Sequence, residues 1–393
     1  MNLYTGDLDV IKNEIKSLEL ELKTEKDRDR IVGIVSTIEL LIELYNDVNK
    51  KTPKSLKLYK ITNRKKVKIS DKIQKKESES YIKNFIDNKS FHGLFVNDLY
   101  YDMSKKEEEL LFSFIEDVKL SYKEMYDIMM GYLSEEGLTT PFNELLKNKR
   151  IFKGLNAEMG YAGYAAHNTI NNTSCILVVD DDSSISTMTT MIHELGHVID
   201  FTNLNNTQGF TTANDYYLKS IYNVVFSMLI EKDFLSYLLR NNIYSEDACS
   251  LTEDYYYNII ESLKNLLVLS SLDDKLLVGD AYIDLKSNEL MANVRKNNKD
   301  IVLHEDIIPS ELDIHNDLVY GYGGILATYY NYLKEKDPDK YNFYKERFLE
   351  NRANSFNIKE FSRMFSDYGE LEENVLKKMD DDIKIKMKVY HEN

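Results

Sequence analysis

Apolar residues recur at every third or fourth position along much of the chain, and this spacing predicts a mainly helical protein. Within residues 8–50 the apolar positions form two runs, separated by the charged residues 27–29. We expect two antiparallel helices there, because the charged stretch interrupts the apolar face. The same spacing predicts helices over 105–148, about 215–239, 251–296 and 338–393.

Three stretches depart from the helical pattern. Residues 174–179 read Ser-Cys-Ile-Leu-Val-Val, a short apolar run between polar residues that predicts a strand. Residues 51–76 are rich in lysine, and we interpret them as a solvated connector with a short hairpin around 63–64 rather than as a binding patch. The Gly-, Ala- and Tyr-rich residues 154–164 predict a loop or strand lining a channel, and His167 reads as a polar loop residue.

The clearest chemical pattern lies within residues 187–200, where His193, Glu194 and His197 form His-Glu-x-x-His. Imidazoles four positions apart lie on one face of a helix and can bind a single Zn²⁺, while the adjacent glutamate can act as general base. An apolar back and a serine N-cap at 183 or 184 favour a helix here. The apolar back consists of Met188, Ile192, Leu195 and Ile199.

A chance match inside a core helix is the alternative explanation of this pattern. The predicted strand before the helix favours the functional one, because many zinc peptidases place an edge strand beside the metal-binding helix, where a peptide can pair with it. A polar loop is expected after the helix, over 203–212.

Composition narrows the possible partners. The 393 residues carry a net charge of −16, which argues against nucleic acid or an anionic membrane surface as the main partner. The two cysteines have no CxxC spacing, so neither a disulfide framework nor a structural zinc cluster is expected. No secretory signal or membrane-spanning run is evident, and we expect a cytoplasmic protein.

Three stretches together resemble the zinc oligopeptidase family of thimet oligopeptidase and oligoendopeptidase F. They are the strand, loop and His-Glu-x-x-His helix of 174–201, the helix with a serine and a later glutamate at 224–239, and the Tyr-Gly-rich segment after His315. The resemblance spans roughly 154–335. It implies a mainly α, two-lobed zinc-peptidase fold with a small sheet beside a deep substrate channel. We predict an N-terminal helical lobe over 1–150 and a catalytic domain over 151–393.

The resemblance also assigns roles to residues. His193 and His197 would bind Zn²⁺ and Glu194 would be the general base. His315, Tyr320 and Tyr322 are candidates to hydrogen-bond the tetrahedral oxyanion, although their spacing departs from the family pattern; packing in the core is the alternative for the tyrosines.

The third zinc ligand departs from the family pattern. The family's glutamate position falls on Val224, which cannot coordinate a metal. We expect Glu231 to replace it, with Asp215 as a second candidate. Asp200 shares a helix face with the two histidines and is expected to orient one of them.

These patterns predict a zinc-dependent endopeptidase that hydrolyses short peptides, with no nucleic-acid or membrane partner. The rival hypothesis, motivated by Val224, is a catalytically weak or inactive peptide-binding protein that retains the peptidase fold.

Overall fold

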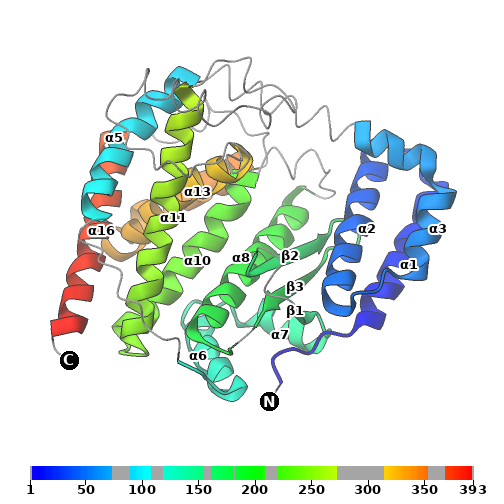
Figure 1. The fold of residues 1–393 in the computed structure, drawn as a ribbon, viewed down its shortest axis with the longest axis horizontal. Coiled ribbons are helices and arrows are strands. Elements are labelled where there is room, and N and C mark those ends of the chain that lie inside the picture. The colour runs from blue at the N-terminus through cyan, green and yellow to red at the C-terminus, as the bar shows by residue number, and fades with distance from the viewer. Residues whose placement is uncertain are drawn as a thin grey trace, which may run out of the picture. The chain divides into compact units, whose positions relative to one another are not determined.

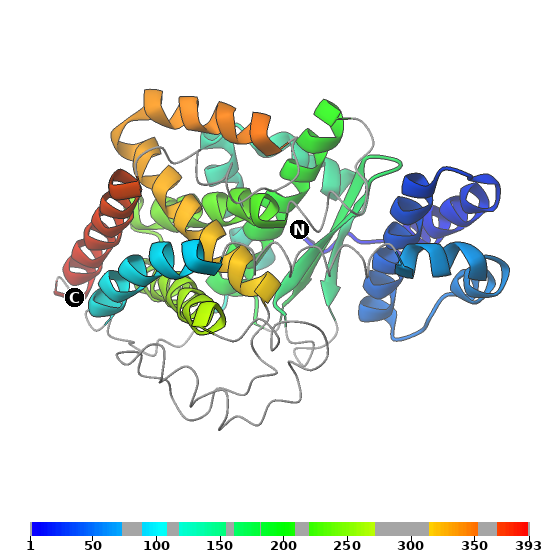
Figure 2. The ribbon, with the colours of Figure 1, turned by 90° about the horizontal axis from the view of Figure 1, so that it is seen from above.

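The computed structural model describes residues 2–72, 89–107, 118–154, 161–180, 182–208, 220–271, 314–352 and 368–391. The described residues are mainly helical, as the sequence predicts, and include a small sheet of three strands (Figures 1 and 2). The helices are α1 Leu8–Thr24, α2 Arg28–Asn49, α3 Lys54–Thr62, α5 Lys89–Glu107, α6 Tyr122–Glu135, α7 Thr139–Lys147, α8 Ile185–Gln208, α10 Ser220–Arg240, α11 Ser245–Ser271, α13 Ile314–Lys336, α14 Pro338–Arg352 and α16 Tyr368–His391. The strands are β1 Ile151–Gly154, β2 Gly163–Asn168 and β3 Thr173–Val179.

The chain groups into two compact units that each combine distant stretches of sequence. Unit 1 contains Met1–Gln74, Phe114–Tyr217 and Phe226–Leu251, and unit 2 contains Lys75–Ser113, Leu218–Val225 and Thr252–Asn393. The expected division at residue 150, into an N-terminal helical lobe and a catalytic domain, concerns function rather than packing and stays a prediction. No helix among the described residues is long and apolar enough to cross a membrane.

The sheet of unit 1 has the strand order β1-β3-β2. The expected strand at 174–179 is confirmed as β3, which pairs in parallel with β1 and antiparallel with β2. β3 is the central strand, so the expectation that it forms the edge beside the histidine helix is wrong. Among the described strands, that edge belongs to β2, whose pairing runs from Gly163 opposite Val178 to Asn168 opposite Thr173. Because β2 lies between β1 and β3 along the chain, a local sequence pattern does not reveal this strand order.

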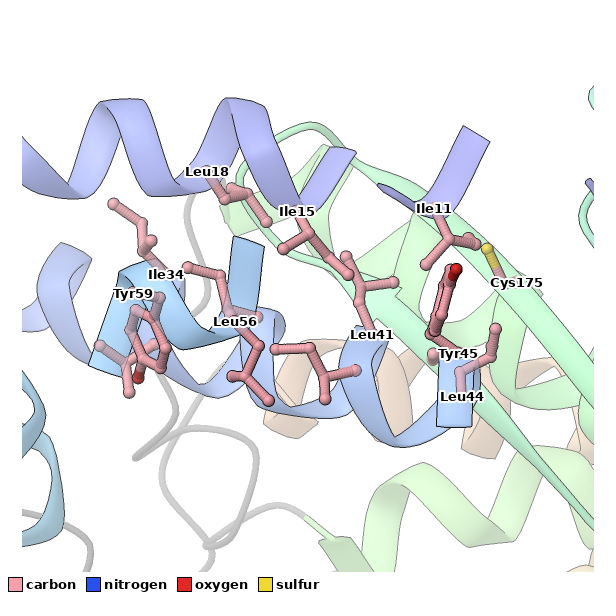
Figure 3. Packing of buried hydrophobic residues seen from close by; sticks show 14 of the residues in the cluster. Ile11, Ile15, Leu18, Ile34, Leu41, Leu44, Tyr45, Leu56, Tyr59 and Cys175 are labelled. Carbon is pink, nitrogen blue, oxygen red and sulfur yellow. The ribbon is translucent and has the colours of Figure 1, made fainter. Parts of the chain in front are cut away.

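The expected helices of 8–50 are confirmed as α1 and α2, which the three residues 25–27 connect. Asp7 and Asp27 cap their N-termini, since each side chain accepts a backbone N–H of the first turn. The apolar stripes of α1 and α2 meet in one core that extends to the sheet (Figure 3). On the sheet side the core includes Phe152, Ala166, Cys175 and Leu177.

A buried polar network also joins α1 to the sheet. Glu14 of α1 accepts hydrogen bonds from Asn168 at 2.5 Å and Thr173 at 2.7 Å, and forms an ion pair with Arg150 at 2.8 Å. Arg150 also donates to the Cys175 sulfur at 3.2 Å. Burial raises the pKa of the Cys175 thiol to about 12, so this thiol stays protonated. One carboxylate of α1 thus contacts the start of β1, the end of β2 and the start of β3.

The lysine-rich stretch after α2 is helical, and the expected hairpin at 63–64 is wrong. α3 ends at Thr62, and residues 64–72 form a second helix beyond Asn63. Leu56 and Tyr59 account for the helical structure, because they lie three positions apart and both bury their side chains in the core of α1 and α2 (Figure 3).

The helix with the His-Glu-x-x-His pattern is confirmed as α8. Of the two candidate serines, Ser184 caps it, since its hydroxyl accepts the Thr187 N–H at 3.3 Å. The four expected apolar residues of its back, from Met188 to Ile199, are all buried. The helix extends through 203–208, so the expected polar loop is wrong over those residues, and 209–212 lie outside the described ones. The first glycine or proline after Gly196 is Gly209, so nothing in the sequence stops the helix earlier.

Unit 2 holds buried charges between α11, α13 and α16. Lys378 lies 2.8 Å from Glu335 and 3.2 Å from Asp382, and Tyr256 donates to Asp382 at 2.7 Å. Lys386 forms an ion pair with Glu253. Burial lowers the pKa of the Lys378 ammonium, but Asp382 and Glu335 outweigh burial and raise it. The helices of this unit are therefore joined by paired charges as well as by apolar packing.

Candidate functional site

α8 presents both histidines of the pattern on one side. The imidazoles of His193 and His197 lie edge to face, with ring centroids 5.0 Å apart and planes inclined by 71°. Both residues are half-buried, whereas the neighbouring Leu195 and Val198 are buried in the core. The four-residue spacing therefore places two imidazoles one helical turn apart at the edge of the core.

Glu231 of α10 contacts the first histidine. Its Oε2 lies 2.6 Å from His193 Nδ1. One turn earlier on α10, Ser227 lies against Gly196, where a Cβ atom would come within 2.5 Å of the Ser227 Cα. The absence of a side chain at Gly196 lets the two helices approach closely, and this approach brings Glu231 to the histidine (α8 and α10 in Figure 1).

Glu194 is buried, with 5% of its surface exposed. Its Oε2 has no hydrogen-bond partner among the described residues. Burial raises the pKa of this carboxyl group to about 7; the charge of His193 lowers it and that of Glu231 raises it. Gly163, at the start of β2, makes room for this side chain, because a Cβ there would lie 3.2 Å from Glu194 Cγ and 2.8 Å from the Leu177 carbonyl oxygen.

The charges around His193 favour its protonated form. Burial lowers the pKa of the imidazole, but the hydrogen bond and charge of Glu231, together with the charge of Glu194, outweigh burial and raise it. In the metal-free chain the negative charges of both Glu194 and Glu231 therefore act on His193.

The donor types at this site suit Zn²⁺, which proteins bind through imidazoles and carboxylates. Two imidazoles and the Glu231 carboxylate lie side by side on α8 and α10. Within the described ranges, however, no three His, Cys, Asp or Glu side chains already surround a common point as metal ligands do. The Glu231 oxygen is placed on a histidine nitrogen instead. The donor set therefore fits zinc in kind, and a change in side-chain rotamers would be needed to complete the coordination.

The remaining predicted residues have separate positions. Asp215 lies outside the described residues. Asp200 is buried on α8, one turn after His197. Val224, at the family's ligand position, is an apolar buried residue of α10, two turns before Glu231. Their expected roles, that of Asp200 in orienting a histidine and that of Asp215 as a ligand, stay predictions.

The three oxyanion candidates lie on α13 of unit 2. The side chain of His315 lies outside the described part of the structure. Tyr320 is 41% exposed and Tyr322 is buried. Residues two apart on a helix face opposite directions, so only one of these tyrosines can address a given site. Which of the three contacts an oxyanion stays a prediction.

Sequence reasoning missed a row of stacked rings beside the site. His167 belongs to β2 and is buried, so its interpretation as a loop residue is wrong. Its ring stacks on Phe201 of α8 at 5.1 Å, and Phe201 stacks on His197 at 6.1 Å. His167 Nδ1 lies 2.7 Å from the Ser174 hydroxyl across the β2–β3 pair. His197 and Phe201 are one helical turn apart, so the sequence could have placed them on one face of the helix. It gave no sign that His167 of β2 would stack on them.

Comparisons with known proteins leave the family open. No protein-family model matches the chain, and no curated protein matches it. A solved structure from Bacillus anthracis str. Ames, described as a "putative oligoendopeptidase F", matches with a TM-score of 0.43 and 13% sequence identity. The match covers 96% of this chain and 69% of that chain. A TM-score and an identity this low do not establish a shared family or activity.

Proposed function

We propose that the chain is a zinc-dependent endopeptidase that hydrolyses short peptides. The observation that carries the proposal is the environment of Glu194, a buried carboxyl group with one unpartnered oxygen among the described residues and a pKa of about 7, on the same helix as two adjacent imidazoles. A carboxyl group with a pKa near the working pH is suited to accept and return a proton.

His193, His197 and Glu231 would hold the metal in this proposal. When bound, Zn²⁺ lowers the pKa of a water and polarises the scissile carbonyl. Glu194 would take a proton from the attacking water as the new C–O bond forms. It would return that proton to the amide nitrogen as the C–N bond breaks, so no covalent intermediate with the chain is needed. His315, Tyr320 or Tyr322 would donate a hydrogen bond to the oxyanion.

Glu231 has two alternative roles, and its contact with His193 Nδ1 is relevant to both. As a ligand it would leave that nitrogen and bind zinc directly. As a positioning residue it would keep the contact and fix the orientation of the ring, as carboxylates commonly do beside zinc-bound histidines. In the second case a different residue would supply the third ligand.

Zinc content and peptide cleavage, measured on the full chain purified without chelator, test the proposal. We expect about one zinc per chain in the wild type. Glu194→Gln should keep the zinc but lower kcat/KM on a quenched fluorescent peptide by roughly a thousandfold. Glu144→Gln on the exposed surface of α7 is the matched control and should change neither.

Glu231→Gln distinguishes the two roles. Loss of zinc assigns it as a ligand, whereas retained zinc with a lowered kcat assigns it as a positioning residue. A wild-type chain that binds no zinc and cleaves no peptide would contradict the proposal. Binding of peptides without cleavage would then support the rival hypothesis of an inactive peptide-binding protein.

A further inference from the structure

A strongly basic stretch of sequence, residues 51–72, belongs to unit 1 and is here called the basic segment. It contains nine lysines and arginines but a single acidic residue, Asp71, whereas the rest of the chain carries 41 basic and 65 acidic residues. Ordinary soluble surfaces mix the two signs. The basic segment therefore has a charge opposite to that of the chain that carries it.

Eight of the nine cations of this segment are exposed, although the charge of Lys60 acts on the Glu39 carboxyl group of α2. Lys66 is the exception, because its ammonium donates to the backbone carbonyls of Leu22 and Glu25 at the end of α1. Among the described residues, none of the other cations forms an ion pair within 4 Å. They are exposed without exception: Lys51, Lys54, Lys57, Lys60, Arg64, Lys65, Lys68 and Lys72.

The solvent face of α3 also carries two aliphatic side chains. Lys54, Lys57, Leu58 and Ile61 occupy positions i, i+3, i+4 and i+7, which share one face of a helix. Leu58 is 48% exposed and Ile61 is 67% exposed. The opposite face holds Leu56 and Tyr59, whose side chains point into the core (Figure 3).

We propose that the basic segment docks on an anionic lipid surface, with Leu58 and Ile61 entering the interfacial region and the lysines contacting the headgroups. Charge complementarity identifies the occupant: exposed aliphatic side chains surrounded by flexible cations are the pattern of a helix lying in a membrane interface. Eight of the nine cations are lysines, which suit a diffuse anionic surface better than a fixed carboxylate or phosphate geometry.

Nucleic acid fits this surface less well than lipid does. Base stacking needs exposed aromatic rings, and Tyr59, the only aromatic residue between 51 and 72, is buried. Exposed aliphatic side chains gain little from a phosphate backbone. The proposal departs from the expectation that the net charge of −16 disfavours an anionic membrane as a partner. Attraction to a charged surface decays within about 10 Å, so the charges nearest the surface outweigh the net charge of the chain.

Co-sedimentation of the full chain with vesicles tests the proposal. Vesicles of phosphatidylcholine with 30% phosphatidylserine are compared with pure phosphatidylcholine, in low and high salt. We expect at least tenfold tighter binding to the anionic vesicles in low salt and loss of that preference in high salt. Replacing Lys57, Lys60, Lys65 and Lys68 by glutamate should weaken binding at least tenfold, since each lysine near the surface contributes roughly fivefold.

A charge-matched control has glutamate at Lys105, Lys147, Lys384 and Lys388, all exposed elsewhere, and should bind within about twofold of the wild type. The pair Leu58→Ser and Ile61→Ser should weaken vesicle binding several-fold at unchanged charge. Equal binding to both kinds of vesicle, or equal losses in the two charge-reversed variants, would overturn the proposal. Binding to single-stranded DNA that exceeds vesicle binding would overturn it in favour of a nucleic acid.

Discussion

Gly196 of α8 lies so close to Ser227 of α10 that a Cβ atom on the glycine would come within 2.5 Å of the Ser227 Cα. Both the serine backbone and the buried Ile230 side chain occupy the space a methyl group would need. This close approach sets the distance between the two helices that carry His193 and Glu231.

Gly196→Ala should therefore force α8 and α10 apart. We expect the free energy of unfolding to fall by about 2 kcal/mol, the usual cost of overpacking a core, as measured by urea denaturation. Ser17→Ala on the exposed face of α1 is the control and should change stability by less than about 0.5 kcal/mol. Equal stability of G196A and wild type would show that the helices separate at no cost.

The raised pKa of Glu194 predicts a stability difference that depends on pH in the metal-free chain. The folded-state pKa of about 7 lies above the unfolded value of 4.5. Its contribution is therefore fully present below pH 4.5 and is lost as the pH rises through 7. Relative to wild type, E194Q should gain up to about 3 kcal/mol between pH 4.5 and 8.5. Parallel stability curves for the two proteins would contradict a buried, high-pKa carboxyl group.

His167 predicts a dependence of the opposite sign. Burial lowers the pKa of its imidazole from 6.5 to about 4. The neutral ring contributes roughly 3 kcal/mol to the free energy of unfolding. This contribution is fully present above pH 6.5 and is lost as the pH falls through 4. Urea denaturation of wild type and H167Q at pH 7 and pH 4 measures this difference. The free energy of unfolding of H167Q should fall less between pH 7 and pH 4 than that of the wild type. An equal fall in both proteins would indicate that the ring is in contact with water.

Lys378 should be needed chiefly to neutralise the carboxylates around it. K378M would leave Asp382 buried and short of a cation, at a cost of about 3–5 kcal/mol in unfolding free energy. The double variant Lys378→Met with Asp382→Leu should recover part of that loss, because it removes the buried carboxylate but also the acceptor of the Tyr256 hydroxyl. Chemical denaturation of both variants checks this; a double variant less stable than the single one would contradict it.

The sequence predicted the elements that carry their own periodic pattern. α1, α2 and α8 each have apolar residues at helical spacing that end up buried, and β3 is an apolar run. The sequence does not assign β2 as a strand, and the stretch 154–164, which overlaps its start, predicts a loop or strand, because the residues of β2 are small, aromatic and polar rather than alternating. Its place in the sheet depends on its pairing with β3. In the lysine-rich stretch, only Leu56 and Tyr59 of α3 belong to the buried core cluster. Two apolar positions are too few to form a recognisable helical pattern in the sequence.

The candidate site was predictable only in part for the same reason. The spacing of His193 and His197 within one helix places them together from sequence alone. The approach of Glu231 depends on how α10 packs on α8, and the glycine that permits it, Gly196, reads in the sequence as an ordinary member of the motif. The packing of Glu194 against Gly163 depends likewise on a strand whose position no local pattern gives.

The contacts of Glu14 have a consequence for the order of folding. This carboxylate precedes its partners Arg150, Asn168 and Thr173 by about 140–160 residues. Closing so long a loop is slow relative to local helix formation. We therefore expect the helical pair α1–α2 to form before the sheet, since the strand beside Glu194 pairs with β3, which begins at Thr173. A chain lacking α1 would leave Arg150, whose side chain is 13% exposed, without its carboxylate partner beside the sheet that contacts the candidate catalytic residue.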